Sequence, residues 1–559
     1  MGKRVVSLFL ACCLLVSLAG VGMVTVSAAQ LDGRNLSVSV DGREAVVVKA
    51  YQSSYDNNLL VSLRDLAAVL SGTEKGFSIA IEPDEESGTR IVIRKGQAYT
   101  PVGGEGEPNT QLDVGDCIYA STSYNKLYLD DQEMRLPTYL HFSTEEGPAD
   151  IYVRMADLGM YFDLNLVYTG QDTLTLDTTT GYQYDLEKQQ SEGYFQDLHG
   201  VVLGDANTGC VLYAYNGDVS TQIASTTKLM TYLLVKEAID AGNLTEESIY
   251  TVSEDVYRLA NSEDGIYRKK GKYGTLALGD EVTVGDLLRA MLIVSANEAA
   301  TALAEMVSGS EEAFTQLMNQ RAQELGLASA VFYNPHGLPD YTQSPTASKR
   351  QNEMSAEDMF RLTQYLLNNH REHLTTITRM TKTDLPSFGQ TPEGKVAYAK
   401  TTNALLYNFP DCLGLKTGTT NRSGANLVSA LPVTDGTGDT HDLVVVLFGG
   451  EDDIERCEKT AWLFRYARQY YAQTAFPQEQ VVEETTAVTV APTTEATQPA
   501  TMATEPTVVQ APEASPEQPG KVLLMMGISF LTGAVVMLVV VILIRKTGRR
   551  KDYNPKFGR

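Results

Sequence analysis

The stretch Ser225-Thr-Thr-Lys-Leu-Met-Thr-Tyr-Leu-Leu-Val235 decides the fold of this chain. Its apolar side chains leave few polar faces, so the stretch predicts a helix at the centre of a domain. Residues three apart lie on one side of a helix, so Lys228 is expected one turn below Ser225, at the helix N-terminus. A lysine buried there can lose its proton and activate the serine hydroxyl. Taken alone, the motif is better explained as an ordinary helix-cap serine beside a surface lysine.

A second motif, Ser295-Ala-Asn297, follows the apolar run 287–294 and precedes a helix-like segment. We therefore expect a corner between two helices. A hydroxyl at such a corner can pass a proton to a leaving amine, and the asparagine amide can hold a substrate peptide group. Taken alone, the motif is better explained as a polar corner without function.

A third motif, Lys416-Thr417-Gly418, is expected to end a strand at 413–415. Lysine and threonine on a strand present a cation and a hydroxyl to a carboxylate, and Gly418 lets a bound peptide lie close. The same tripeptide recurs at 546–548, so it is weak evidence alone. Its strand context and its place after the other two motifs make it informative.

Strands surround this group of motifs. Two apolar strands are predicted within 200–216, helices dominate to about residue 375, and strands return at 412–415, 425–431 and 443–448, before an amphipathic helix at 455–471. Strands at both ends with helices between them predict an α+β domain over 195–475. We expect an antiparallel sheet shared by both ends and a helical subdomain.

Residues 195–475 resemble the serine-type D-alanyl-D-alanine carboxypeptidase family, among the low-molecular-mass penicillin-binding proteins. The resemblance covers about half of the chain and implies a penicillin-binding/β-lactamase-like fold. Beyond the three motifs it rests on Asp205-Ala-Asn-Thr-Gly209, Gly279-Asp-Glu-Val-Thr-Val-Gly-Asp-Leu-Leu288, Asn334-Pro-His-Gly-Leu338, Thr402-Asn403 and Gly414-Leu-Lys-Thr-Gly-Thr419.

The resemblance implies a role for each motif residue. Ser225 would be the nucleophile, Lys228 the base, and Ser295 a proton-transfer group. Substrate binding would fall to Asn297, Lys416, Thr417, Gly418 and Thr419, with the N–H groups of Ser225 and Thr419 as an oxyanion hole. His336 would be structural. The implied substrates are peptidoglycan stem pentapeptides, the implied covalent inhibitors are β-lactam antibiotics, and no cofactor or metal is implied.

Two other functions fit the same motifs. A serine β-lactamase would need a dedicated group, often a glutamate on a loop, for rapid deacylation, and none can be placed between 297 and 416. The Asn334–Leu338 segment favours the peptidase. A penicillin-binding sensor or wall scaffold is the other alternative. Endopeptidase or transpeptidase side activity remains open.

Residues 30–185 form a strand-rich region with a diverged repeat. Val61-Ser-Leu-Arg-Asp-Leu-Ala67 aligns with Val153-Arg-Met-Ala-Asp-Leu-Gly159, and each copy is followed by an alternating strand, 90–94 or 173–177. We expect a strand, a short helix and a strand pair in each half. The region resembles the β/α module first named from the N-terminus of copper amine oxidases. Its one histidine, His141, is not a metal site, and a spacer or wall-binding role is the expectation.

The two ends of the chain carry membrane signals. Residues 1–28 read as a signal peptide, with Lys3 and Arg4 before an apolar run and Val26-Ser-Ala28 as the cleavage site. A Thr/Pro/Glu/Ala-rich stretch at 478–520 predicts a disordered linker. Residues 522–544 are apolar throughout and predict one transmembrane helix before a basic tail, 545–559. The positive-inside tendency places this tail in the cytoplasm and the catalytic domain outside the cell membrane.

Composition excludes one class of partner. The chain has 45 basic and 70 acidic residues, a net charge of −25. Nucleic acid is therefore not expected, because phosphate binding needs a basic face. The four cysteines beyond the signal peptide, Cys117, Cys210, Cys412 and Cys457, are expected to be free or buried thiols.

Overall fold

The computed structural model describes residues 28–477, except 54–57, 85–87, 102–116, 124–126, 131, 135, 137, 142–149, 270 and 340–349. The predicted signal peptide (apart from Ala28), linker, transmembrane helix and basic tail lie outside the described residues. Among the residues that are described, none of the helices has the length and apolar character needed to cross a bilayer.

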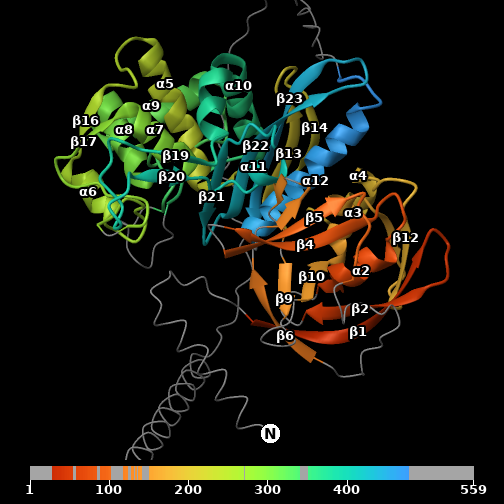
Figure 1. Ribbon diagram of the computed structural model, residues 1–559. Helices are drawn as coiled ribbons and strands as arrows, with labels where there is room; N and C mark the ends of the chain where they lie inside the picture. Colours follow the sequence, from red (N-terminus) through yellow and green to blue (C-terminus); the bar gives the residue numbers. More distant parts are fainter. Residues whose placement is uncertain are drawn as a thin grey trace, which may run out of the picture. The chain divides into compact units, whose positions relative to one another are not determined.

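The N-terminal region is built mainly from strands (Figure 1). Its elements are β1 (Ala28–Val40), β2 (Val46–Ser53), β3 (Leu59–Ser62), α2 (Leu63–Val69), β4 (Phe77–Asp84), β5 (Gly88–Lys95), β6 (Cys117–Ser123), β7 (Leu127–Leu129), β8 (Gln132–Met134), β9 (Thr138–His141), β10 (Asp150–Arg154), α3 (Met155–Phe162), β11 (Asn165–Tyr168) and β12 (Thr173–Asp177). The strands β1, β2, β3, β10, β9 and β6 form a closed ring of pairings, because β6 pairs with both β9 and β1.

The two aligned sequence segments lie in runs of elements that follow the same order. One copy runs from β3 through α2 into the hairpin β4–β5, and the other from β10 through α3 into the hairpin β11–β12. Strands β3 and β10 pair directly, with Val61 opposite Val153, so the repeated segments are neighbours in space. Their inward side chains, such as Leu66 and Leu158, share one buried cluster.

The second region begins with α4 (Leu186–Ser191) and joins a sheet to a group of helices. Its further elements are β13 (Gly200–Asp205), β14 (Val211–Tyr215), β15 (Thr221–Gln222), the 3₁₀ helix η1 (Ala224–Thr227), α5 (Lys228–Asp240), β16 (Ile249–Thr251), α6 (Glu254–Ala260), β17 (Glu281–Thr283), α7 (Val284–Ile293), α8 (Asn297–Ser308), α9 (Glu311–Glu324), β18 (Glu353–Met354), α10 (Ala356–Thr378), β19 (Lys382–Asp384), β20 (Tyr398–Lys400), α11 (Leu405–Asn408), β21 (Lys416–Thr420), β22 (Gly424–Thr434), β23 (Thr440–Gly450) and α12 (Asp453–Tyr471).

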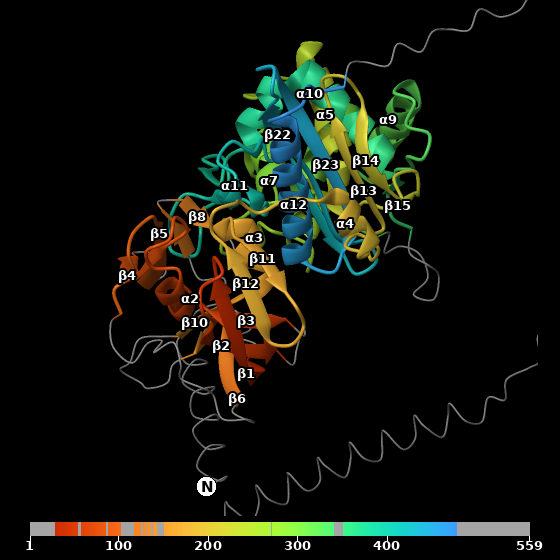
Figure 2. The same cartoon turned by 90° about the vertical axis from the view of Figure 1, so that its right-hand side faces the viewer.

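The five-stranded antiparallel sheet of this region has the order β14-β13-β23-β22-β21. It therefore joins strands from both ends of the region, as the sequence predicts for an α+β domain. Alternate side chains enter two cores: Val444 and Val446 pack with α5, α7 and α10, whereas Val445 and Leu447 pack with α12. Figure 2 shows α12 lying along β22 and β23. The sheet is thus covered on both faces.

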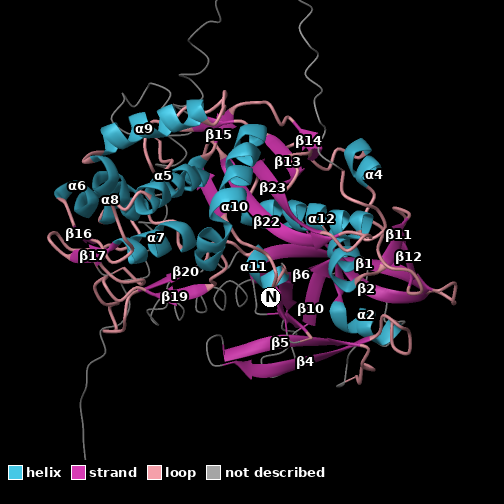
Figure 3. Ribbon diagram, turned by 90° about the horizontal axis from the view of Figure 1, so that it is seen from above, coloured by secondary structure: helices cyan, strands magenta, loops and turns pink. Residues whose placement is uncertain are grey.

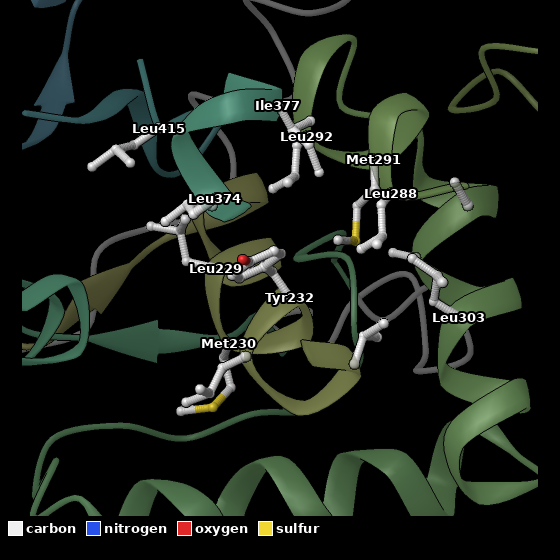
Figure 4. Packing of buried hydrophobic residues seen from close by; sticks show 14 of the residues in the cluster. Leu229, Met230, Tyr232, Leu288, Met291, Leu292, Leu303, Leu374, Ile377 and Leu415 are labelled. Atoms are coloured by element: carbon white, nitrogen blue, oxygen red, sulfur yellow. The ribbon is translucent and has the colours of Figure 1, made fainter. Parts of the chain in front are cut away.

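The helix α5 lies at the centre of the larger core. Leu229, Met230, Tyr232 and Leu233 are fully buried, among side chains from α7, α8 and α10 (Figure 4). The expectation of a central helix is confirmed, with one difference. The helix begins at Lys228, and Ser225 lies in the 3₁₀ turn η1 immediately before it.

A second difference concerns the strand that carries the third motif. The sequence predicts a strand that ends before Lys416, whereas β21 begins at Lys416. The reason is the backbone of the two preceding residues, because Gly414 and Leu415 have φ values of 80° and 83°. Left-handed residues cannot continue a strand. A Cβ at Gly414 would also lie 2.1 Å from the Thr378 carbonyl oxygen, so only glycine fits there.

Candidate active site

Ser225 is held on a rigid turn between a short strand and the central helix. Ala224 has a φ of 46°, an uncommon conformation for a residue with a side chain. Gly337 packs against this turn so closely that a Cβ on it would lie 1.9 Å from the Ala224 carbonyl oxygen. The side chain of Ser225 is half-buried rather than enclosed. The turn therefore presents the hydroxyl to a substrate from a fixed backbone.

Lys228 joins the first motif to the second motif and to the backbone of His336. Its ammonium donates hydrogen bonds of 2.8 Å each to the Ser225 hydroxyl, the Asn297 side-chain oxygen and the His336 carbonyl oxygen. The lysine is completely buried, and this burial lowers its pKa to about 7, against a smaller opposing effect of Glu298. A lysine with such a pKa can be neutral near physiological pH and can accept a proton from Ser225.

The second motif forms the expected corner between α7 and α8. Ser295 has a φ of 69°, which turns the chain sharply before Asn297 begins α8. Asn297 is brought to Lys228, and its amide group donates to the Asp264 carbonyl oxygen at 2.8 Å. Ser295 is half-buried, and its hydroxyl makes no hydrogen bond within the described part of the chain. The structure therefore joins Asn297, but not Ser295, to the network of Lys228.

The third motif lies against Ser225 across the edge of the sheet. A Cβ on Gly418 would lie 2.8 Å from the Ser225 backbone nitrogen, so β21 and η1 approach each other as closely as a glycine permits. This approach places the backbone beside Gly418 next to that of Ser225. Amide donors from two such segments can form an oxyanion hole.

Lys416 and Thr417 of β21 are buried and contribute an amine and a hydroxyl to the site. Lys416 is fully buried and donates to the Thr417 carbonyl oxygen at 2.8 Å. Burial lowers its pKa well below the ordinary value, with repulsion from Lys228 and Arg456 as further causes. The Thr417 hydroxyl lies 2.6 Å from the Thr402 hydroxyl. A substrate carboxylate bound here would favour the charged form of Lys416 and could accept hydrogen bonds from the lysine and the threonine hydroxyl.

Arg456, on α12, belongs to the site although the sequence did not indicate it. Its guanidinium donates to the Thr419 hydroxyl at 2.9 Å and to the Gly418 carbonyl oxygen at 3.3 Å. It is 3% exposed and also pairs with Asp453 at 3.0 Å. Only its place on the buried face of an amphipathic helix could have drawn attention to it, since arginine is rarely buried unless it is paired.

Glu298 is a second residue that the sequence reasoning missed. Its carboxylate accepts the backbone N–H groups of Ile266 and Tyr267 at 2.8 and 2.7 Å, and it is fully buried. Burial raises its pKa. Glu298 and its neighbour Asn297 therefore hold the segment 264–267 against the site. His336 was expected to be structural, and it contributes its backbone carbonyl to Lys228 while its ring lies near Glu311.

The described residues contain no group of three or more His, Cys, Asp or Glu side chains that could hold a metal ion. The chemistry visible at the site is that of a hydroxyl, a neutralisable amine, amide donors and cations. Of the predicted thiols, Cys210, Cys412 and Cys457 are free, and the last two are buried.

Comparison with known proteins shows what this site resembles. A family model described as D-alanyl-D-alanine carboxypeptidase matches residues 196–451. The carboxypeptidase DacF of Bacillus subtilis is 31% identical over 287 residues, 51% of this chain and 66% of that protein. The carboxypeptidase DacC of Escherichia coli is 30% identical over 283 residues, 50% of this chain and 64% of that protein.

The chain thus spans slightly less than two thirds of the length of these two D-alanyl-D-alanine carboxypeptidases. Among solved structures, penicillin-binding protein 6B from Escherichia coli is 28% identical, with a TM-score of 0.41. That likeness covers 49% of this chain and 78% of the other protein.

Proposed function

We propose that this protein is a serine-type D-alanyl-D-alanine carboxypeptidase that removes the terminal D-alanine from peptidoglycan stem pentapeptides. One observation carries the proposal: the fully buried Lys228 contacts the Ser225 hydroxyl at 2.8 Å, directly beside the strand of Gly418. The match of residues 196–451 to the D-alanyl-D-alanine carboxypeptidase family model supports it.

Acylation follows from this geometry. Neutral Lys228 takes the proton of Ser225, and the oxygen attacks the carbonyl carbon of the penultimate D-alanine. The backbone N–H groups of Ser225 and Thr419 stabilise the developing oxyanion, each by about 3–4 kcal/mol. The terminal carboxylate is held by Lys416 and Thr417, and Arg456 supports the same strand through Thr419.

Release of D-alanine and hydrolysis complete the cycle. The Ser225 ester forms as the C–N bond breaks, and the leaving amine receives a proton through Ser295 or Lys228. Asn297 holds the peptide group of the acyl part. Water then adds to the ester, and Ser225 regains its proton. The same nucleophile would open a β-lactam ring, so β-lactam antibiotics are proposed as covalent inhibitors.

Two readouts on the full chain test the proposal. Free D-alanine is followed during incubation with a stem pentapeptide, and mass spectrometry maps the adduct formed with benzylpenicillin. We expect release of one D-alanine per peptide and a penicillin adduct on Ser225 that stops the release. An adduct without any release would indicate a sensor, and rapid loss of the adduct with hydrolysed penicillin would indicate a β-lactamase.

The rate of Ser225 acylation should rise with pH through a midpoint near pH 7. The reason is the pKa of about 7 that burial gives Lys228, because only the neutral amine can accept the proton. Below the midpoint the lysine is protonated and acylation slows. Stopped-flow acylation by a chromogenic β-lactam between pH 5 and pH 10 measures this. A midpoint near pH 10, as for an exposed lysine, would contradict the assignment.

Glu298→Gln supplies a second check on that midpoint. The glutamine keeps an oxygen for the Ile266 and Tyr267 N–H groups but removes the charge that raises the pKa of Lys228. The midpoint should therefore move to lower pH. A midpoint that stays in place would mean that Lys228 is not the group being titrated.

Gly418→Ala should lower the acylation rate by at least about tenfold, and up to the 10²–10³-fold typical of a lost oxyanion donor. The added methyl would lie 2.8 Å from the Ser225 nitrogen and 3.0 Å from the Thr226 nitrogen, so β21 must move away from η1. Acylation kinetics and the melting temperature are measured on the same variant. A normal rate in a variant with an unchanged melting temperature would overturn the role of this close approach.

The segments before and after the catalytic region are part of the same proposal. Residues 1–28 would direct export, and a single span at 522–544 would hold the catalytic domain on the cell-wall side, with the basic tail in the cytoplasm. The charge pattern of those segments supports this arrangement. The strand-rich region 30–185, which resembles the copper amine oxidase N-terminal module, would act as a spacer or wall-binding unit.

A further inference from the structure

Two segments near the site concentrate positive charge in an acidic chain. The loop Gly265-Ile-Tyr-Arg-Lys-Lys-Gly-Lys-Tyr-Gly-Thr275 contains four basic residues and no acidic one, although the whole chain has a net charge of −25. The hairpin β19–β20 (Lys382–Asp384 and Tyr398–Lys400) adds Lys382 beside this loop. We call Arg268, Lys269, Lys272 and Lys382 the cationic rim.

Aromatic side chains hold two of these cations in place. The Lys272 ammonium lies 4.7 Å from the centre of the Tyr273 ring, and the Lys382 ammonium lies 4.7 Å from the centre of the Tyr398 ring. The two rings meet edge to face at 5.2 Å, and the Tyr398 N–H donates to the Tyr273 carbonyl oxygen at 2.9 Å. The loop and the hairpin therefore form one surface, on which the ammonium groups of Lys272 and Lys382 are each held against an aromatic ring.

The charges of the cationic rim are unneutralised. All four side chains are exposed, and within the described residues none of them forms an ion pair with a carboxylate. The hairpin segment has its own acids, Asp384 and Glu393, but both are exposed and neither pairs with the rim. Elsewhere in the same region cations such as Arg289 and Arg371 are paired. An unpaired cationic surface is suited to an anionic ligand.

The cationic rim is anchored to both sides of the site. The loop is held by Asn297, which donates to the Asp264 carbonyl oxygen, and by Glu298, which accepts two loop N–H groups. The hairpin continues to Thr402, whose hydroxyl lies 2.6 Å from that of Thr417. Figure 3 shows β19 and β20 beside α7, which leads into the Ser295 corner.

The cationic rim lies within reach of a short peptide bound at Thr417. Four residues separate Tyr398 from Thr402 along the chain, and such a segment spans at most roughly 13 Å. A stem pentapeptide in extended form spans roughly 16 Å. A substrate whose C-terminus is held at Thr417 can therefore reach the cationic rim with the residues that precede its last two alanines.

We propose that the cationic rim binds a free carboxylate on the residues upstream of the terminal D-alanyl-D-alanine, so that acidic stem peptides are preferred over their amidated forms. This inference rests on the proposed function and names its substrate class. Two or more cations attract the carboxylate electrostatically, whereas the corresponding amide is neutral and lacks this attraction. We expect kcat/KM to be about three- to tenfold higher for the acid, as for one or two exposed ion pairs.

The test compares matched pentapeptides on the full chain. Each pair differs only in Glu against Gln at the third or fourth position from the C-terminus, and D-alanine release is measured at low and high salt. The preference for the acid should appear at one of these positions at least and shrink as salt rises, because screening weakens exposed charge pairs. Equal kcat/KM values for acid and amide at low salt would overturn the inference.

Charge reversal identifies the surface responsible. Lys272→Glu combined with Lys382→Glu should abolish or invert the preference, while Lys188→Glu, an exposed lysine on α4, should leave it unchanged. Acylation by benzylpenicillin, which lacks the upstream residues, should be normal in all variants. An unchanged preference in the double variant would refute the role of the rim. A phosphodiester wall polymer that binds the rim without any discrimination between acid and amide peptides would also refute it.

These outcomes are separable from failure of the proposed function. If no peptide releases D-alanine, the carboxypeptidase proposal itself fails. If both peptides of every pair are hydrolysed equally well, the carboxypeptidase proposal stands and only the preference for acidic stems is wrong.

Discussion

Ser225→Ala should lose penicillin labelling completely and lose D-alanine release by at least about 10⁴-fold, the scale seen when a nucleophile is removed from a serine hydrolase. The hydroxyl is the group that Lys228 contacts at 2.8 Å, and it lies on the turn that Gly337 and Gly418 both approach closely. The fold should persist, because a half-buried hydroxyl contributes little to the core. Intact-mass analysis after penicillin treatment and a coupled D-alanine assay give the two readouts.

A neighbouring serine provides the matched control. Ser220 is exposed, five residues earlier, and its hydroxyl has one long contact of 3.4 Å to the Ser329 carbonyl oxygen. Ser220→Ala should retain full labelling and full turnover. Labelling of the Ser225→Ala variant at another residue, with turnover intact, would show that the nucleophile has been misassigned.

Lys228→Met is expected to lower the acylation rate by about 10²–10⁴-fold, the contribution of a general base. Methionine has a similar length and fills the same buried position on α5, so the packing around Leu229 and Tyr232 is retained. It cannot accept the Ser225 proton. The variant should also lose the rise in rate near pH 7 that the buried lysine predicts. Stopped-flow acylation across pH and a thermal melt separate this effect from unfolding.

Lys236→Met is the control on the same helix. Lys236 pairs with Asp240 at the surface of α5, two turns beyond Lys228, and has no contact with Ser225. The acylation rate of Lys236→Met and its pH midpoint should match those of the parent protein. Near-normal acylation in Lys228→Met, with the same midpoint, would move the role of the base to Lys416 or another group.

Much of the site could be predicted because the geometry of each motif depends mainly on residues that are close in the sequence. A serine three residues before a lysine, at the start of an apolar helix, places both on one side of that helix whatever the rest of the chain does. The corner at Ser295 follows from the change between two helical segments. These are short-range consequences of backbone geometry and hydrophobic pattern.

Other features depend on residues far apart in the chain. Lys228 meets Asn297 and the His336 carbonyl, 69 and 108 residues away, and those two contacts complete its surroundings. Arg456 reaches Thr419 from the last helix. No local pattern encodes such contacts, because they exist only once the sheet and helices have packed. The start of β21 was misplaced for a related reason: Gly414 and Leu415 have a left-handed backbone, and Gly414 packs closely against Thr378, which lies far away in the sequence.

The amino-acid sequence alone therefore predicts which chemical groups form the site and their order along the chain. It also predicts the α+β class and the central position of the helix after Ser225. These follow from hydrophobic periodicity and from the fixed geometry of helix and strand. Tertiary packing alone produces the full burial that lowers the pKa of Lys228 to about 7 and the close approach of Gly418 to Ser225. Burial and close approach are properties of neighbours in space, and neighbours in space are decided by how the whole domain packs.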